Sequence, residues 1–152
     1  MIGHLQTNKV KQIAPFVSLI HSVDSLKLLT EINKCAAKEN RVIDCLLQIY
    51  IAKEETKFGL NFEEAEALLH SEEIKELKNI RITGLMGMAT LTDNESQIRS
   101  EFLSLSSFFN KLNTKNLELR TLSMGMSSDY KMAIQEGSNL IRVGSLIFGN
   151  RH

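Results

Sequence analysis

The sequence has few of the features that mark secreted, membrane or nucleic-acid-binding proteins. Its 152 residues include two cysteines, one proline and no tryptophan, and 18 basic residues balance 18 acidic ones. A net charge of zero gives no support for a nucleic-acid footprint. No apolar run approaches the roughly 20 residues of a membrane helix, and the first residues lack the basic and apolar regions of a signal peptide. We therefore expect a cytoplasmic protein without nucleic-acid or membrane partners.

The cysteines and histidines suggest neither a disulfide framework nor a metal site. Cys35 and Cys45 do not form a Cys-x-x-Cys pair, and the four histidines are scattered along the chain. We expect two reduced thiols, with Cys45 inside an apolar strand. No histidine spacing matches a metal-ligand motif, so no metal is predicted.

Short apolar runs alternate with segments of helical periodicity along the whole chain. A composition of 43% apolar and 24% charged residues suits one globular domain over residues 1–152. Alternating strands and helices predict a parallel sheet with right-handed crossovers. The predicted helices lie at about residues 25–38, from 61, from 71, 95–112 and 129–136, and the predicted strands at 16–22, 42–51, 80–88, 117–122 and 140–143, with a sixth implied at 1–6.

The last thirty residues contain two Gly/Ser turns after consecutive strands. The first turn follows Ser123 and Met124, and the second is Gly144-Ser145, two residues beyond Arg142. Glycine lets a backbone approach a ligand closely, and neighbouring N–H groups can converge on an anion. An arginine inside an apolar strand needs a partner for its charge. These features predict a phosphorylated ligand.

Phosphate turns after the last two strands favour a (β/α)8 barrel over an open doubly wound sheet. A barrel needs eight strands, whereas the pattern shows about six βα units. We therefore expect an incomplete barrel that lacks its first two strands. The unpaired sheet edges of such a barrel favour self-association.

Several motifs occur together in the order and spacing of a known family. The chain resembles the YggS/PROSC-type pyridoxal 5′-phosphate (PLP) homeostasis proteins over essentially its whole length. That resemblance implies a barrel of the alanine racemase N-terminal type, which binds PLP and buffers or delivers it without established catalysis. The motifs are Gly3-His4-Leu5-Gln6-Thr7-Asn8-Lys9, Ser22-Val23-Asp24-Ser25, Leu47-Gln48-Ile49, Gly84-Leu85-Met86, Ser123-Met124-Gly125-Met126-Ser127 with Asp129, and Arg142-Val143-Gly144-Ser145.

The resemblance also implies roles for particular residues. The phosphate is expected on the turns at Ser123-Met124 and Gly144-Ser145, and Arg142 is expected to face the pyridine nitrogen. A cation there keeps the nitrogen unprotonated, which weakens the ring as an electron sink. Two further residues have alternatives. Met86 either flanks the ring or is a core residue, and His4 either faces the pocket or is an ordinary partly buried histidine.

One departure from the family concerns covalent binding. In the family, a lysine at the end of the first strand holds the PLP aldehyde as a Schiff base, and that segment has no counterpart here. We therefore expect weak, reversible binding. Lys57 and Lys9 either steer the anionic cofactor or trap its aldehyde transiently, or they are solvated loop lysines. Two other functions remain open, a PLP-dependent racemase-like enzyme and a barrel for another phosphorylated metabolite such as a sugar phosphate.

Overall fold

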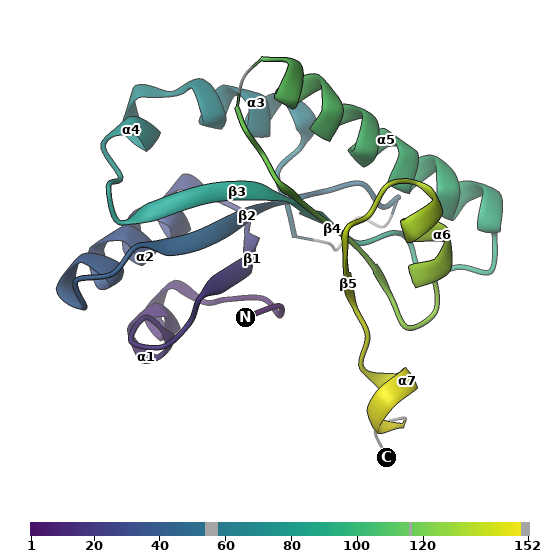
Figure 1. Cartoon of the computed structure of the whole chain (residues 1–152), viewed down its shortest axis with the longest axis horizontal. Helices are drawn as coiled ribbons and strands as arrows, with labels where there is room; N and C mark the ends of the chain where they lie inside the picture. Colours follow the sequence, from purple (N-terminus) through teal and green to yellow (C-terminus); the bar gives the residue numbers. More distant parts are fainter. Residues whose placement is uncertain (54–57, 116, 150–152) are drawn as a thin grey trace.

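The computed structural model describes residues 1–53, 58–115 and 117–149 and centres on a curled parallel sheet (Figure 1). Each strand pairs in parallel with its neighbour in sequence order, β1-β2-β3-β4-β5. A doubly wound sheet would instead reverse its order at a switch point. The α/β class and the barrel-type topology are therefore confirmed as a five-stranded, curled half-barrel. The strands are β1 (Leu19–Val23), β2 (Ile43–Ile49), β3 (Ile80–Gly87), β4 (Thr121–Met126) and β5 (Leu140–Arg142).

Helices cover the convex side of the sheet, while α7 lies apart near the C-terminus (Figure 1). Before β1 come the 3-10 turn η1 (Thr7–Lys9) and α1 (Val10–Ile13). In the described residues, no helix is both long and apolar enough to cross a membrane. The other helices are α2 (Leu26–Lys38), α3 (Phe62–His70), α4 (Glu72–Lys75), α5 (Glu95–Thr114), α6 (Tyr130–Gln135) and α7 (Ser145–Phe148).

The helix boundaries follow from local side-chain chemistry. Ser25 caps α2 through its Oγ, which accepts a hydrogen bond from the Leu28 N–H at 3.2 Å. Asn61 and Glu64 form a reciprocal capping box at the start of α3. Gly137, with φ of 105°, ends α6 in the left-handed conformation that glycine adopts easily. These three predicted boundaries are confirmed.

The apolar core lies between the convex face of the sheet and the helices. Both cysteines are buried free thiols, as predicted, and burial raises the pKa of Cys45 to about 12. Such thiols are inert at neutral pH. The core includes Ile20, Cys45, Leu47, Leu85, Leu122 and Met124 from the strands, and Leu29, Ile32, Phe102 and Leu105 from the helices.

The structure corrects two predicted strands. β4 begins at Thr121 rather than at residue 117, because Asn113 of α5 holds Leu119 outside the sheet through two hydrogen bonds of 3.0 and 2.8 Å. Residues 1–6 are not a strand, so the sheet of the described residues has five strands rather than six. The segment still contacts β1, because Met1 donates to Leu19 O at 2.8 Å and accepts from His21 N at 2.9 Å, and Gly3 O accepts from Ser22 Oγ at 2.6 Å.

Candidate functional site

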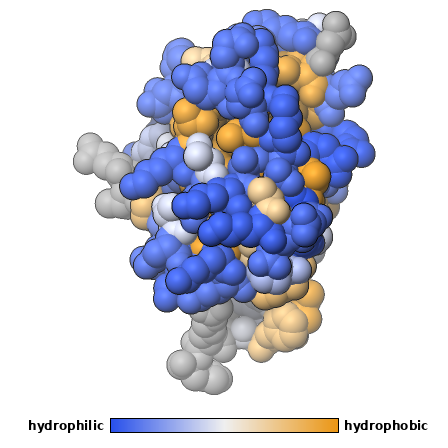
Figure 2. All heavy atoms as spheres, turned by 90° about the vertical axis from the view of Figure 1, so that its left-hand side faces the viewer, coloured by the Kyte–Doolittle hydropathy of each residue, from blue (hydrophilic) through white to orange (hydrophobic). Residues whose placement is uncertain are grey.

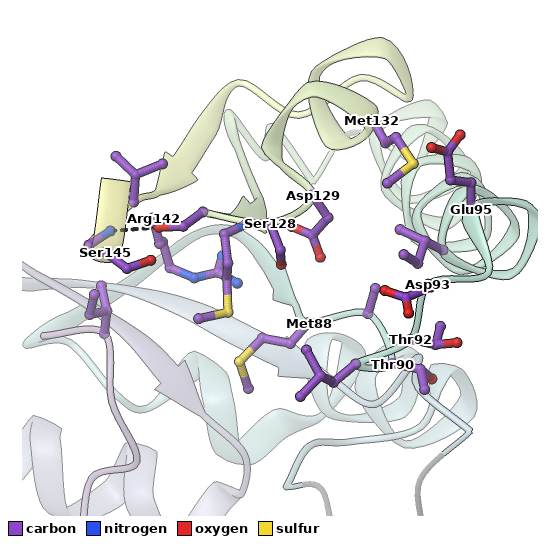
Figure 3. Close-up of a pocket in the computed structure, with 18 residues that line it drawn as sticks. Met88, Thr90, Thr92, Asp93, Glu95, Ser128, Asp129, Met132, Arg142 and Ser145 are labelled. Carbon is purple, nitrogen blue, oxygen red and sulfur yellow. Dashed lines mark hydrogen bonds between the residues drawn. The ribbon is translucent and has the colours of Figure 1, made fainter. Parts of the chain in front are cut away.

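A cavity of about 1170 Å³ opens at the carboxyl ends of β3, β4 and β5 (Figure 3). Its walls come from the β3–α5 segment, the β4–α6 segment and the β5–α7 segment. Arg142 and Ser145 lie at one end, whereas Glu95 and Met132 lie at the other (Figure 3). Parallel barrels place their active sites at this end of the strands, so the cavity is the candidate site.

Arg142 places a buried positive charge in the wall of this cavity. The side chain is 8% exposed, and its Nη1 donates to Ser123 O at 2.8 Å and to Ser123 Oγ at 2.7 Å. Nη2 donates to Gly87 O at 3.0 Å. Burial lowers the pKa of Arg142 to about 10, although the charge of Asp129 acts in the opposite direction. Arg142 forms no ion pair with the residues that the structure describes, so its nearest acceptors are neutral.

Two backbone N–H groups of the β5–α7 turn converge on one oxygen beside Arg142. Ser127 Oγ accepts from Gly144 N at 3.1 Å, drawn as a dashed line in Figure 3, and from Leu146 N at 3.4 Å. A Cβ built on Gly144 would meet no atom within 4 Å. The turn therefore has both the converging donors and the open space that an anion oxygen requires.

The turn after β4 adjoins the β5–α7 turn and forms another part of the cavity wall. Asp129 Oδ1 accepts a hydrogen bond from Met126 N at 2.7 Å, so the Asp129 side chain orders this turn. Asp129 also stands at the N-cap position of α6, but its side chain makes no cap hydrogen bond to that helix. The carboxylate is used by the turn instead.

Three predicted site residues, Arg142, Gly144 and Ser145, line the cavity together. Ser123 and Met124 lie within β4 rather than in the turn, because that strand continues to Met126. The Ser123 side chain is buried beneath Arg142, whereas Met124 belongs to the convex-side core. Residues 127–129 therefore form the turn that the sequence placed at Ser123-Met124.

The remaining predicted residues lie outside the lining of the cavity. Met86 is fully buried in register with Ser123, and it is Met88 that lines the cavity. His4 stacks on Phe58 with ring centroids 4.0 Å apart. Contact of Met86 or His4 with a ligand stays a prediction. Lys57 lies outside the described residues, and no lysine among the described ones lines the cavity.

Sequence reasoning missed two contributors to the site. The first is the link that Ser127 makes, because its hydroxyl joins the two turns by accepting from Gly144 N and Leu146 N. The second is His21, whose Nδ1 lies 3.1 Å from Ser123 Oγ, and Ser123 connects it to Arg142. Within the described residues, no three His, Cys, Asp or Glu side chains are placed to hold a metal ion.

The fold and this site define the class of alanine racemase N-terminal domains, and the model of that family matches residues 1–152. The pyridoxal phosphate homeostasis protein of Aquifex aeolicus is 42% identical over 99% of this chain and 65% of its own length. The Synechocystis protein of the same name is 36% identical over 99% of this chain and 68% of its own.

A solved structure is also similar to this chain, both in sequence and in fold. PipY of Synechococcus elongatus, solved with PLP bound, is 32% identical with a TM-score of 0.84, covering 97% of this chain and 68% of that one. The chain thus spans about two thirds of the length of these relatives. It belongs to the pyridoxal phosphate homeostasis protein family.

Proposed function

We propose that this chain binds pyridoxal 5′-phosphate in the cavity and serves its homeostasis, by buffering or delivering the cofactor rather than by catalysis. The observation that carries this proposal is Arg142, a buried cation with neutral partners, beside the converging N–H groups of Gly144 and Leu146. The names of the relatives and the PLP-bound PipY structure support the same ligand.

The residues that line the cavity fit two polar groups of this cofactor, its phosphate and its pyridine nitrogen. The N–H groups that now converge on Ser127 Oγ would hold a phosphate oxygen, and the space beside Gly144 would admit it. Arg142 would face the pyridine nitrogen, since three of its five N–H donors are taken by Ser123 and Gly87 and the other two have no acceptor among the residues that the structure describes.

Arg142 also explains why the site would bind without catalysing. When bound, PLP supplies a ring that stabilises carbanions best with its nitrogen protonated. A guanidinium opposite that nitrogen keeps it unprotonated and restrains this chemistry. Because no described lysine lines the cavity, we propose weak, reversible binding through the phosphate and the ring nitrogen.

The test is a PLP titration of the purified chain, followed by absorbance, beside the variants Gly144→Ala and Gly3→Ala. The methyl group of Gly144→Ala enters open space, so we expect an unchanged melting temperature but binding weakened by about tenfold or more, roughly 1.4 kcal/mol. Gly3→Ala is the matched control, because Gly3 lies outside the cavity lining. Absence of saturable binding in the folded chain, or equal affinity in Gly144→Ala, contradicts the proposal.

We also propose that the chain acts in the cytoplasm and associates with a second copy of itself. The two buried free thiols support a reducing compartment. β5 pairs only with β4 in the described sheet, and α7 beside it exposes Leu146, Ile147 and Phe148. Figure 2 shows a mainly hydrophilic face with an apolar group at its lower end, the level of α7 in Figure 1.

Sedimentation over a range of concentrations tests this association. We expect a dimer that dissociates in Phe148→Asp, because a charge on α7 opposes burial of the apolar group. A wild-type chain that stays monomeric at every concentration contradicts the proposal.

A further inference from the structure

We propose that His21 is a positioning residue, which acts through the Ser123 hydroxyl to hold the Arg142 guanidinium at the cavity wall. The three side chains form a continuous buried chain of hydrogen bonds, His21 to Ser123 at 3.1 Å and Ser123 to Arg142 at 2.7 Å. The purpose of this positioning, to present Arg142 to a ligand, rests on the proposed function. The hydrogen-bond chain itself does not.

The directions of the hydrogen bonds follow from the chemistry of the donors. A guanidinium only donates, so Ser123 Oγ accepts from Arg142 Nη1. The Ser123 hydroxyl proton must then point elsewhere, and the acceptor within reach is His21 Nδ1. His21 is therefore neutral, with its proton on Nε2. In this arrangement a lone pair of Ser123 Oγ is aimed at Arg142.

The electrostatic surroundings favour the same protonation state. His21 is 7% exposed. Burial, then the charge of Arg142, then that of the Met1 amino group lower the pKa of His21 to about 4. A protonated His21 would turn Nδ1 from acceptor to donor and place a second cation beside the buried Arg142. The neutral ring thus keeps the hydrogen bond that orients Ser123 toward Arg142, whereas a charged ring would lose that bond and repel the guanidinium.

The position of the three residues in the sheet explains what the chain of hydrogen bonds achieves. His21 lies on β1 and Ser123 on β4, and these strands are separated in the sheet by β2 and β3. Their side chains meet across the concave face of the curled sheet. His21 therefore connects the far side of the half-barrel to the strand that carries the hydrogen-bond acceptors of Arg142.

The matched variants are His21→Asn and His21→Leu. Asparagine places an amide oxygen near the position of Nδ1 and keeps an acceptor for Ser123, whereas leucine places a methyl group there. In nitrogen-15 NMR of the ligand-free chain, we expect wild-type His21 as the neutral Nε2–H tautomer at neutral pH. We expect ordered guanidinium signals of Arg142 in the wild type and in His21→Asn, and broadened signals in His21→Leu.

Ligand binding gives a second readout, with PLP as the probe. We expect His21→Leu to weaken PLP binding by about fivefold, the effect of losing one hydrogen bond of ordinary net strength, and His21→Asn to restore it. In a Ser123→Ala background the same His21→Leu change should have almost no effect, because the connecting hydroxyl is gone.

The two readouts separate the two proposals. If the wild-type chain is folded but does not bind PLP, the proposed function fails, while the NMR signals of Arg142 still decide the role of His21. The positioning role is overturned if the His21 proton lies on Nδ1, if Arg142 remains equally ordered in His21→Leu, or if the effect of His21→Leu persists without Ser123.

Discussion

Two neighbouring rows of the same sheet differ in chemistry, because one is entirely apolar and the other carries two polar side chains. Leu47, Leu85 and Leu122 lie side by side in register and belong to the convex-side core. The next row, one residue further along each strand, is Gln48, Met86 and Ser123. Both rows are buried, but successive side chains of a strand point to opposite faces. The first row packs against the helices, and the second lines the concave interior.

The difference shows how one sheet serves stability and binding separately. The convex row is apolar and needs no hydrogen bonds, whereas the two polar side chains of the concave row, Gln48 and Ser123, each have a partner among described residues. Gln48 Nε2 donates to Phe58 O at 3.0 Å, and Ser123 joins His21 to Arg142. Substitutions on the convex side should therefore change stability, and those on the concave side should change binding.

The largest expected effect is on the convex side, at Phe102 of α5. Its side chain is fully buried in the core, so Phe102→Ala should lower the free energy of unfolding by about 3–5 kcal/mol through lost burial and a residual cavity. Leu103, the next residue, is 54% exposed, and Leu103→Ala is the control with an effect within about 0.5 kcal/mol. Urea denaturation measures both, and equal effects would contradict this division of the core.

Glu101, also on α5, should have an intermediate effect, because it joins the helix to the rim of the cavity. Its carboxylate accepts from Thr90 N and Thr90 Oγ1, each at 2.7 Å, and from Gln97 Nε2 at 3.0 Å. Glu101→Ala leaves the Thr90 N–H without its acceptor and should lower the free energy of unfolding by about 1–3 kcal/mol.

Hydrogen exchange locates this effect. In Glu101→Ala the Thr90 amide should exchange faster than in the wild type, since its hydrogen bond is lost, while amides of β2 stay protected. Glu101→Gln retains one acceptor oxygen, so its Thr90 amide should exchange at a rate between those of the wild type and Glu101→Ala. If the Thr90 amide exchanges equally in all three proteins, the Glu101 carboxylate does not stabilise the segment at the rim of the cavity.

The comparison of the two rows also explains how far the sequence alone could predict the molecule. Local patterns were sufficient for the starts of α2 and α3. They also singled out Arg142, Gly144 and Ser145, which line one cavity, because an arginine in an apolar strand and a following glycine are visible in a few residues. They were insufficient for the start of β4, since the side chain of Asn113 decides it from another element.

Contacts across the concave face were beyond any local pattern. His21 and Ser123 are 102 positions apart and lie on strands that are not neighbours. Their contact exists only because the sheet curls, and curl depends on the whole sheet. Ser123 was accordingly predicted in a phosphate turn, whereas the structure places it beneath Arg142.

The last expected effect is a pH dependence of stability that the concave face adds. The pKa of His21 falls from 6.5 in the unfolded chain to about 4 in the folded one. Between these values the unfolded chain binds more protons, so the stability from a neutral His21 is complete above about pH 6.5 and is lost as the pH falls toward 4. Arg142 and the Met1 amino group are the charges that act on it.

Urea denaturation at about pH 7 and about pH 5 tests this in the wild type and in His21→Asn. The wild type should lose more stability between the two conditions, because asparagine does not titrate while it keeps the acceptor for Ser123. Glu66, whose pKa the Lys111 and Lys115 ammonium groups lower to about 2, loses its contribution below pH 4.5 and equally in both proteins. Equal losses between pH 7 and 5 would mean that His21 titrates normally, and that the concave face is wetter than the hydrogen bonds of Ser123 indicate.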